Sequence, residues 1–218
     1  MSSPVSSQTI FDITPMVLEG QLVRLEPLTR DHYDEMVKVA LDPAIWQWTQ
    51  RRLLVEKDVH EFIEIALTEQ AAGTSIPWAT RSKADGKLAG STRFMDMVPA
   101  HRTLEIGGTW LNPAWHRSGI NVEAKYLQLC HAFERMAARR VALKTHHANL
   151  KSQAAIRALG ATHEGVFRNH LIHSDGSARH SHWFSIIAEE WPQAKAGLEA
   201  RLGAFSFAAD RVENKRQG

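Results

Sequence analysis

The stretch from residue 111 to residue 124 reads Leu-Asn-Pro-Ala-Trp-His-Arg-Ser-Gly-Ile-Asn-Val-Glu-Ala and joins a predicted strand to a predicted helix. A β-rich run from 104 to 111 precedes it, and an apolar helical pattern begins near Asn121. The first N–H groups of a helix lack intrahelical partners, and the helix dipole makes that end partly positive. A strand, a basic turn and a helix in this order favour a seat for a phosphate or pyrophosphate. The pattern therefore points to a cofactor that carries a nucleotide.

Composition narrows the class of protein. The 218 residues are 44% hydrophobic and 23% charged, which is ordinary for a globular domain. The net charge of +2 and the lack of a basic, aromatic-rich block argue against a nucleic-acid partner. The single cysteine excludes an internal disulfide. No run approaches the ~20 apolar residues that span a bilayer, and no signal-peptide pattern is present, so we expect a cytoplasmic protein without membrane association.

Outward from the opening stretch, apolar periodicity predicts alternating strands and helices. Strands are expected at 23–27, 78–82, 87–97, 103–111, 141–145, 162–173 and 179–188, and helices at 30–41, 55–72, 121–138, 150–159 and 192–202. Asp85-Gly86 and Asp175-Gly176 are hairpin turn signals. The strands at 103–111 and 141–145 are joined through a helix, so they should be parallel.

These elements predict an α+β fold in three layers. We expect one mixed, mostly antiparallel sheet with a splayed parallel strand pair and helices on both faces. Residues 17–202 should form a single domain, with a flexible arm at 1–16 and a polar tail at 203–218. An extended ligand that carries amides could satisfy the unpaired main-chain groups of splayed strands.

Four groups of residues then occur in a fixed order along the chain. They are Leu104-Glu105-Ile106-Gly107 with Trp110-Leu111-Asn112-Pro113; His116-Arg117-Ser118-Gly119-Ile120-Asn121; Asn149-x-x-Ser152 with Ile156-x-x-x-Gly160-Ala161; and Gly165-x-x-Arg168 with Asp175-Gly176…Phe184-Ser185. Over about residues 17–200, this order resembles the GNAT superfamily of N-acetyltransferases, in particular its RimJ/RimL-type branch. The chain departs from the family pattern at His116, where the family has Arg or Gln, and at Asn121, where it has a small residue.

The resemblance implies acetyl-CoA as the donor and a primary amine as the acceptor, either a protein N-terminus or a small-molecule amine. The amine would attack the thioester directly, through a tetrahedral intermediate. Cofactor-binding positions carried over from the family are Leu111, His116, Arg117, Ser118, Gly119, Ile120, Asn121 and Asn149. Asn149 is also a candidate helix N-cap. A homodimer is left open.

Two residues are candidates for proton transfer. Glu105, on the strand beside the expected cleft, is the candidate base; alternatively it faces solvent or pairs with Arg93 or Arg102. Ser152 is the candidate acid for the leaving thiolate, or a helix cap. Gly107-Gly108 would let the strand bulge toward the thioester.

Other features leave alternatives open. None of the twelve histidines shows a metal-ligand spacing, so surface histidines are favoured over a metal site. Trp46 and Trp48 either line an acceptor pocket or pack in the core. A catalytically silent acyl-CoA-binding module is the alternative to an active acetyltransferase, and a metal-dependent hydrolase is a distant third.

Overall fold

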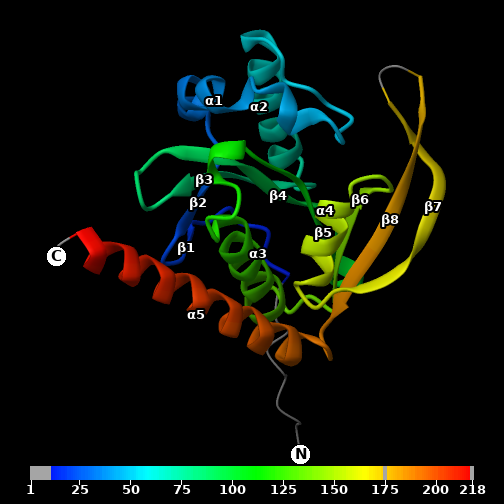
Figure 1. The fold of residues 1–218 in the computed structure, drawn as a ribbon. Coiled ribbons are helices and arrows are strands. Elements are labelled where there is room, and N and C mark those ends of the chain that lie inside the picture. The colour runs from blue at the N-terminus through cyan, green and yellow to red at the C-terminus, as the bar shows by residue number, and fades with distance from the viewer. Residues whose placement is uncertain (1–10, 174–175, 217–218) are drawn as a thin grey trace, which may run out of the picture.

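The computed structural model describes residues 11–173 and 176–216, and one eight-stranded sheet forms its centre (Figure 1). The strands lie in the order β1-β2-β3-β4-β5-β6-β8-β7. Their bounds are β1 Leu18–Glu19, β2 Val23–Pro27, β3 Ile76–Ser82, β4 Leu88–Val98, β5 Thr103–Leu111, β6 Arg140–His146, β7 Thr162–Ile172 and β8 Ala178–Ile187. Neighbouring strands are antiparallel except β5 and β6, which are parallel as predicted.

Helices cover both faces of this sheet (Figure 1). They are α1 Tyr33–Ala40, α2 Glu56–Ala71, α3 Ile120–Cys130, α4 Leu150–Arg157 and α5 Trp191–Arg216. On one face, α1 and α2 share an apolar cluster with Trp110 of β5. On the other face, α3, α4 and α5 contribute to the larger core, which includes Leu104 and Ile106 of β5. The predicted fold class, with helices on both faces of a mixed sheet, is confirmed.

The parallel pair is short. Only Thr103, Leu104 and Glu105 of β5 pair with β6, opposite Arg140, Val141 and Ala142. Both strands continue beyond these positions without pairing to each other. The predicted splay is therefore present, and it begins after Glu105.

A β-bulge in β5 accompanies this separation. Ser91 of β4 pairs with Trp110 and Arg93 with Gly107, so Thr92 alone lies opposite two residues, Gly108 and Thr109. Gly108 has a φ of +56°, the left-handed conformation that glycine adopts at such bulges. The bulge that Gly107-Gly108 predicted is thus observed.

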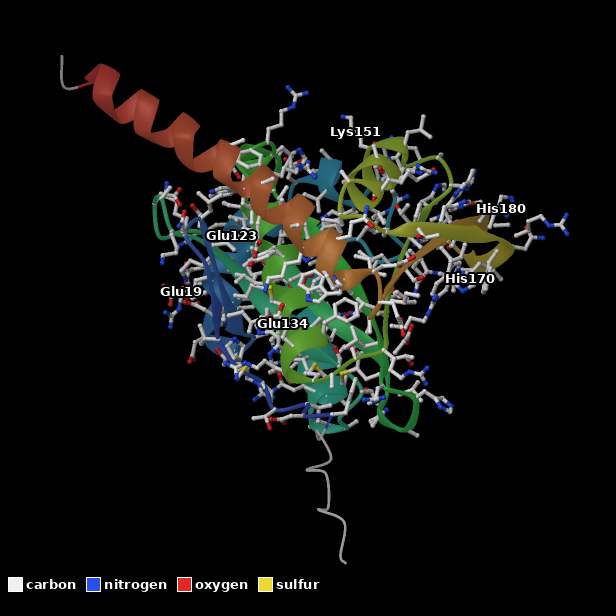
Figure 2. The ribbon with its side chains drawn as sticks, turned by 90° about the horizontal axis from the view of Figure 1, so that it is seen from below. Glu19, Glu123, Glu134, Lys151, His170 and His180 are labelled. Carbon is white, nitrogen blue, oxygen red and sulfur yellow. The ribbon has the colours of Figure 1, made fainter. Side chains whose placement is uncertain are left out.

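A buried glutamate ties the N-terminal strands to α3. Glu123 is 6% exposed, and its carboxylate accepts the main-chain N–H groups of Gln21, Leu22 and Val23 at 2.9, 2.7 and 2.8 Å. A Cβ at Gly20 would lie 2.3 Å from the carboxylate carbon, so this close approach needs glycine. Figure 2 shows Glu123 on the side of the molecule that faces α5.

Some element ends differ from the sequence prediction. The closing helix was expected to end near residue 202, whereas α5 continues to Arg216. The helix expected over 121–138 ends at Cys130 and continues as a π-helical turn, His131–Arg135. Within the described ranges, no helix is long and apolar enough to cross a membrane.

The predicted terminal and turn segments lie partly outside the described residues. Of the arm expected at 1–16, residues 1–10 are not described, while Phe11 and Ile13 pack against the core. Trp78 Nε1 also donates to the Met16 carbonyl at 2.8 Å. The turn predicted at Asp175-Gly176 includes residue 175, which is not described.

Replacing Glu123 with alanine should destabilise the fold. Three buried or half-buried N–H groups would lose a charged acceptor, so we expect a loss of about 3 kcal/mol in the free energy of unfolding. Urea denaturation followed by tryptophan fluorescence measures this loss. Glu61→Ala, at an exposed i,i+4 ion pair with Lys57, is the control and should change it by about 0.5 kcal/mol or less. A loss below about 1 kcal/mol for Glu123→Ala would contradict the proposed tie.

Candidate functional site

Glu105 lies in the last residue pair that β5 forms with β6. It is 2% exposed, so the carboxylate is buried. Its neighbours Leu104 and Ile106 belong to the core beneath α3, and side chains alternate along a strand, so Glu105 faces the side of α1 and α2. A buried carboxylate therefore stands where the two parallel strands separate.

Lys144 of β6 is the charged partner of Glu105. Its Nζ donates to Glu105 Oε2 at 2.5 Å and lies 3.5 Å from Asp96 Oδ2. The same ammonium lies 4.9 Å from the centre of the Trp183 ring on β8, within cation–π range. Lys144 is thus held by two carboxylates and an aromatic ring.

The two arginines considered from the sequence are not partners of Glu105. Arg93 pairs with Glu69 of α2 at 2.6 Å, and Arg102 ends a short turn in the left-handed conformation. The true partner follows from the strand register: Glu105 is opposite Ala142, and Lys144, two residues further along, lies on the same face. That register cannot be read from sequence spacing alone.

The environment of Glu105 tunes its acidity. Burial raises the pKa of Glu105 to about 7, and Asp96 adds to this rise, while the Lys144 ammonium opposes it. A carboxyl group with a pKa near 7 exchanges its proton readily at neutral pH.

A cavity of about 150 Å³ opens beside this carboxylate. It is lined by Asp96, Thr103, Leu104, Glu105, Arg140, Ala142 and Trp183. The carboxylate of Asp96 is 62% exposed, so one wall of the cavity carries a hydrated negative charge. The cavity gives the candidate base access to a small group.

The loop between β5 and α3 has the backbone of an anion seat. Arg117 and Gly119 have φ angles of +63° and +86°, and Gly119 is the N-cap of α3. The N–H groups of Arg117, Gly119 and Asn121 have no hydrogen-bond partner within the described part of the chain. Main-chain N–H groups at a helix N-terminus suit a phosphate group.

Not every predicted N–H group is available. The Ser118 N–H is bonded to the Trp115 carbonyl at 3.4 Å, and the Ile120 N–H to the Ser118 hydroxyl at 3.4 Å. The Ser118 hydroxyl in turn donates to the Trp115 carbonyl at 2.7 Å. His116 and Arg117 are exposed at the front of the loop, and Leu111 ends β5.

Asn149 and Ser152 lie at the start of α4, after the end of β6. Asn149 is the N-cap, and its side-chain oxygen accepts the Ser152 N–H at 3.0 Å. The capping alternative is therefore correct for Asn149 and not for Ser152. The Ser152 hydroxyl has no partner among the described residues. Roles in cofactor binding and proton donation stay predictions.

Histidines gather at the far end of β6. His146 contacts His147, His173 and the ring of Trp48, with ring centres 4.3, 5.3 and 5.1 Å away. Burial and the neighbouring positive groups lower the pKa of His146 to about 4. In the described ranges, no set of three or more His, Cys, Asp or Glu side chains is arranged to hold a metal ion. Figure 2 places His170 and His180 on the nearby β7–β8 hairpin.

The two tryptophans considered for an acceptor pocket have different positions. Trp46 is 3% exposed, packs on Trp110 and donates from Nε1 to the Ala40 carbonyl at 2.8 Å, so it belongs to the core. Trp48 is half-buried beside His146. Only Trp48 stays a candidate for acceptor contact.

The fold and the site together define a protein that binds an extended, phosphate-bearing acyl carrier between two parted strands. The model of the acetyltransferase (GNAT) domain matches residues 23–162, which is more than half of the chain. The chain therefore belongs to the GNAT acetyltransferase family. Members of this family use acetyl-CoA as the acetyl donor, and the free N–H groups of the β5–α3 loop fit its pyrophosphate.

Relatives agree with this assignment. YdaF of Bacillus subtilis (strain 168), assigned as a ribosomal N-acetyltransferase, is 29% identical over 111 residues, which are 51% of this chain and 60% of YdaF. The match thus spans less than two thirds of that relative.

Solved structures share the fold. A T. thermophilus protein assigned as an acetyltransferase is 37% identical, with a TM-score of 0.79 over 87% of this chain and 98% of its own. A GCN5-related N-acetyltransferase from Brucella melitensis is 28% identical, with a TM-score of 0.79 over 86% and 85%. Mycobacterium smegmatis RimJ, solved in complex with CoA-disulfide, is 22% identical, with a TM-score of 0.71 over 85% and 91%. These likenesses support the RimJ/RimL-type branch.

Gly119→Ala should weaken CoA binding at least tenfold. The new Cβ would lie 2.7 Å from Leu22 Cδ1 and 3.1 Å from Phe205 Cγ, at a left-handed residue whose N–H is free. Calorimetry with CoA measures the affinity. Gly86→Ala is the control, since Gly86 has a φ of +69° and open space around it. Both variants should lose about 1–2 kcal/mol of stability. Wild-type CoA affinity in Gly119→Ala would remove the loop as the phosphate seat.

Proposed function

We propose that this protein is an acetyl-CoA-dependent N-acetyltransferase whose acceptor is the α-amine of a protein N-terminus. Glu105 is the general base, and the loop from His116 to Asn121 binds the pyrophosphate. The observation that carries this proposal is the position of Glu105: a buried carboxylate with an open cavity beside it, where β5 and β6 separate.

The acidity of Glu105 favours an α-amine over a lysine-like amine. An acceptor ammonium must lose a proton before its nitrogen can attack. An α-ammonium has a pKa of about 8 and a lysine ammonium one of about 10.4. With the pKa of Glu105 at about 7, proton transfer is uphill by about 1.4 kcal/mol from the first and by more than about 4 kcal/mol from the second. Glu105 is therefore matched to a protein N-terminus.

Other residues have supporting parts. When bound, acetyl-CoA supplies an acetyl thioester whose leaving thiolate is only weakly basic, with a thiol pKa of about 8.5 by analogy with cysteine. The free hydroxyl of Ser152 is the proposed proton donor to that thiolate. The bulge at Gly108 brings main-chain N–H groups to the acyl end of the site, where charge develops on oxygen.

The names of the relatives agree with a protein acceptor. YdaF is assigned as a ribosomal N-acetyltransferase, and RimJ is among the structural neighbours. A ribosomal protein N-terminus is accordingly the acceptor class to test first, and the cytoplasm is the expected compartment. Small-molecule amines are the second class.

Glu105→Gln should lower turnover at least tenfold while acetyl-CoA affinity stays within twofold of wild type. The amide cannot accept the acceptor proton, whereas the phosphate seat is untouched. Release of free thiol, measured with peptides that have a free α-amine and with lysine peptides whose α-amine is blocked, gives turnover and acceptor class together. Binding of acetyl-CoA without thiol release on any amine would instead identify a silent acyl-CoA-binding module. Unchanged turnover in Glu105→Gln would remove Glu105 as the base.

Lys144→Met should move the rise of kcat/KM with pH to higher pH. Glu105 acts as a base only when ionised, so wild-type kcat/KM should rise through about pH 7. The Lys144 ammonium lowers the pKa of Glu105, and its loss raises that pKa. We expect turnover several-fold below wild type at pH 7 and close to it at pH 9. Lys57→Met, at a surface lysine, is the control. An unshifted pH profile would contradict the coupling of Lys144 to Glu105.

A further inference from the structure

Helix α3 buries a lysine against the sheet. Lys125 is 5% exposed, and its Nζ donates to Thr92 Oγ1, Thr109 Oγ1 and Gln128 Oε1 at 2.8, 2.6 and 3.0 Å. Among the described residues it has no ion-pair partner. All three donors of the ammonium are therefore satisfied by neutral oxygen atoms.

A buried ammonium without a counterion is unfavourable for the fold. Burial alone lowers the pKa of Lys125 to about 7. An unbranched apolar side chain such as methionine would fill the same space without this desolvation cost. The presence of lysine here therefore indicates a task that hydrogen bonding, and not packing, performs.

The acceptors of Lys125 show what that task is. Thr92 is the single β4 residue opposite the bulge of β5, and Thr109 is the second residue of the bulge itself. Their hydroxyl groups lie 2.8 Å apart, and Lys125 Nζ bonds to both. Lys125 thus holds the two sides of the bulge together from the α3 face of the sheet.

The bulge is accessible from outside. Gly108 and Thr109 are exposed, although the residues of β5 before and after them, Ile106 and Trp110, are buried. A ligand that lies along β5 beyond Glu105 would meet them. The same helix begins at Gly119, the N-cap of the phosphate seat, six residues or about 9 Å along the axis from Lys125.

We propose that Lys125 is a positioning residue that fixes the bulge of β5 for the acyl end of the donor, and so sets the distance between the phosphate seat and the site of attack. This inference rests on the proposed acetyl transfer. Lys125 acts through Thr92 and Thr109, and it does not contact the reacting atoms. Because the phosphate seat is a separate part of α3, loss of Lys125 impairs turnover and spares CoA binding.

Lys125→Met tests this proposal with two readouts. We expect kcat to fall at least tenfold while the Kd for CoA stays within threefold of wild type. Hydrogen exchange of peptides that cover residues 104–111 should speed up at least tenfold in the same variant. Lys195→Met is the matched control, since this lysine of α5 pairs with Glu134 away from the bulge, and it should change neither readout.

A second pair of variants serves if Lys125→Met does not fold. Thr109→Val keeps the shape of an exposed side chain and removes the acceptor, whereas Thr109→Ser keeps the hydroxyl. We expect kcat to fall at least fivefold in the first and to stay above half of wild type in the second. Turnover and exchange within twofold of wild type in both Lys125→Met and Thr109→Val would overturn the proposal. If the wild-type protein transfers no acetyl group, the proposed function fails, and the exchange measurement still decides the role of Lys125.

Discussion

The short pairing between β5 and β6 is the constraint on which the rest of the site depends. Only three residue pairs hold these parallel strands together, ending at Glu105 and Ala142. Each strand stays paired on its other side: β5 to β4 as far as Leu111, and β6 to β8 as far as His146. The strands therefore part without losing their places in the sheet. Their facing N–H and C=O groups are left for an extended ligand, which is the requirement for a carrier that must lie between them.

Two buried glutamates show how environment separates structural from chemical roles. Glu123 is surrounded by main-chain N–H donors from residues 21–23 and acts as a fixed acceptor. Glu105 is equally buried, but a single lysine and a nearby carboxylate surround it, and burial outweighs the lysine in raising its pKa. The first arrangement holds two elements together, and the second leaves a proton poised to move. The number and kind of neighbouring donors thus distinguishes the two residues.

The sequence predicts those parts of the structure that depend on local pattern. Alternation, helical periodicity and the Gly107-Gly108 pair predict the strands, the helices and the bulge, and the βαβ order predicts the parallel pair. Contacts that depend on register could not be predicted. Lys144 reaches Glu105 because of the pairing between β5 and β6, and Trp48 reaches His146 from a segment far away in the sequence. The end of α5 was also missed, since polar residues after 202 do not by themselves stop a helix.

Helix α3 explains why one segment can dominate the site although its pattern is not a simple apolar stripe. Within three turns it carries the glycine N-cap of the phosphate seat and three buried polar side chains, Glu123, Lys125 and Gln128. Polar residues on a helix ordinarily predict a solvent-facing side, so these positions were not expected in the core. Each is buried because another element supplies its partners: the N-terminal strands bind Glu123, and β4 and β5 bind Lys125. A helix fixed at both the N-terminal strands and the bulge cannot shift without moving the phosphate seat, so the groups that bind the two ends of the donor are held in one rigid unit.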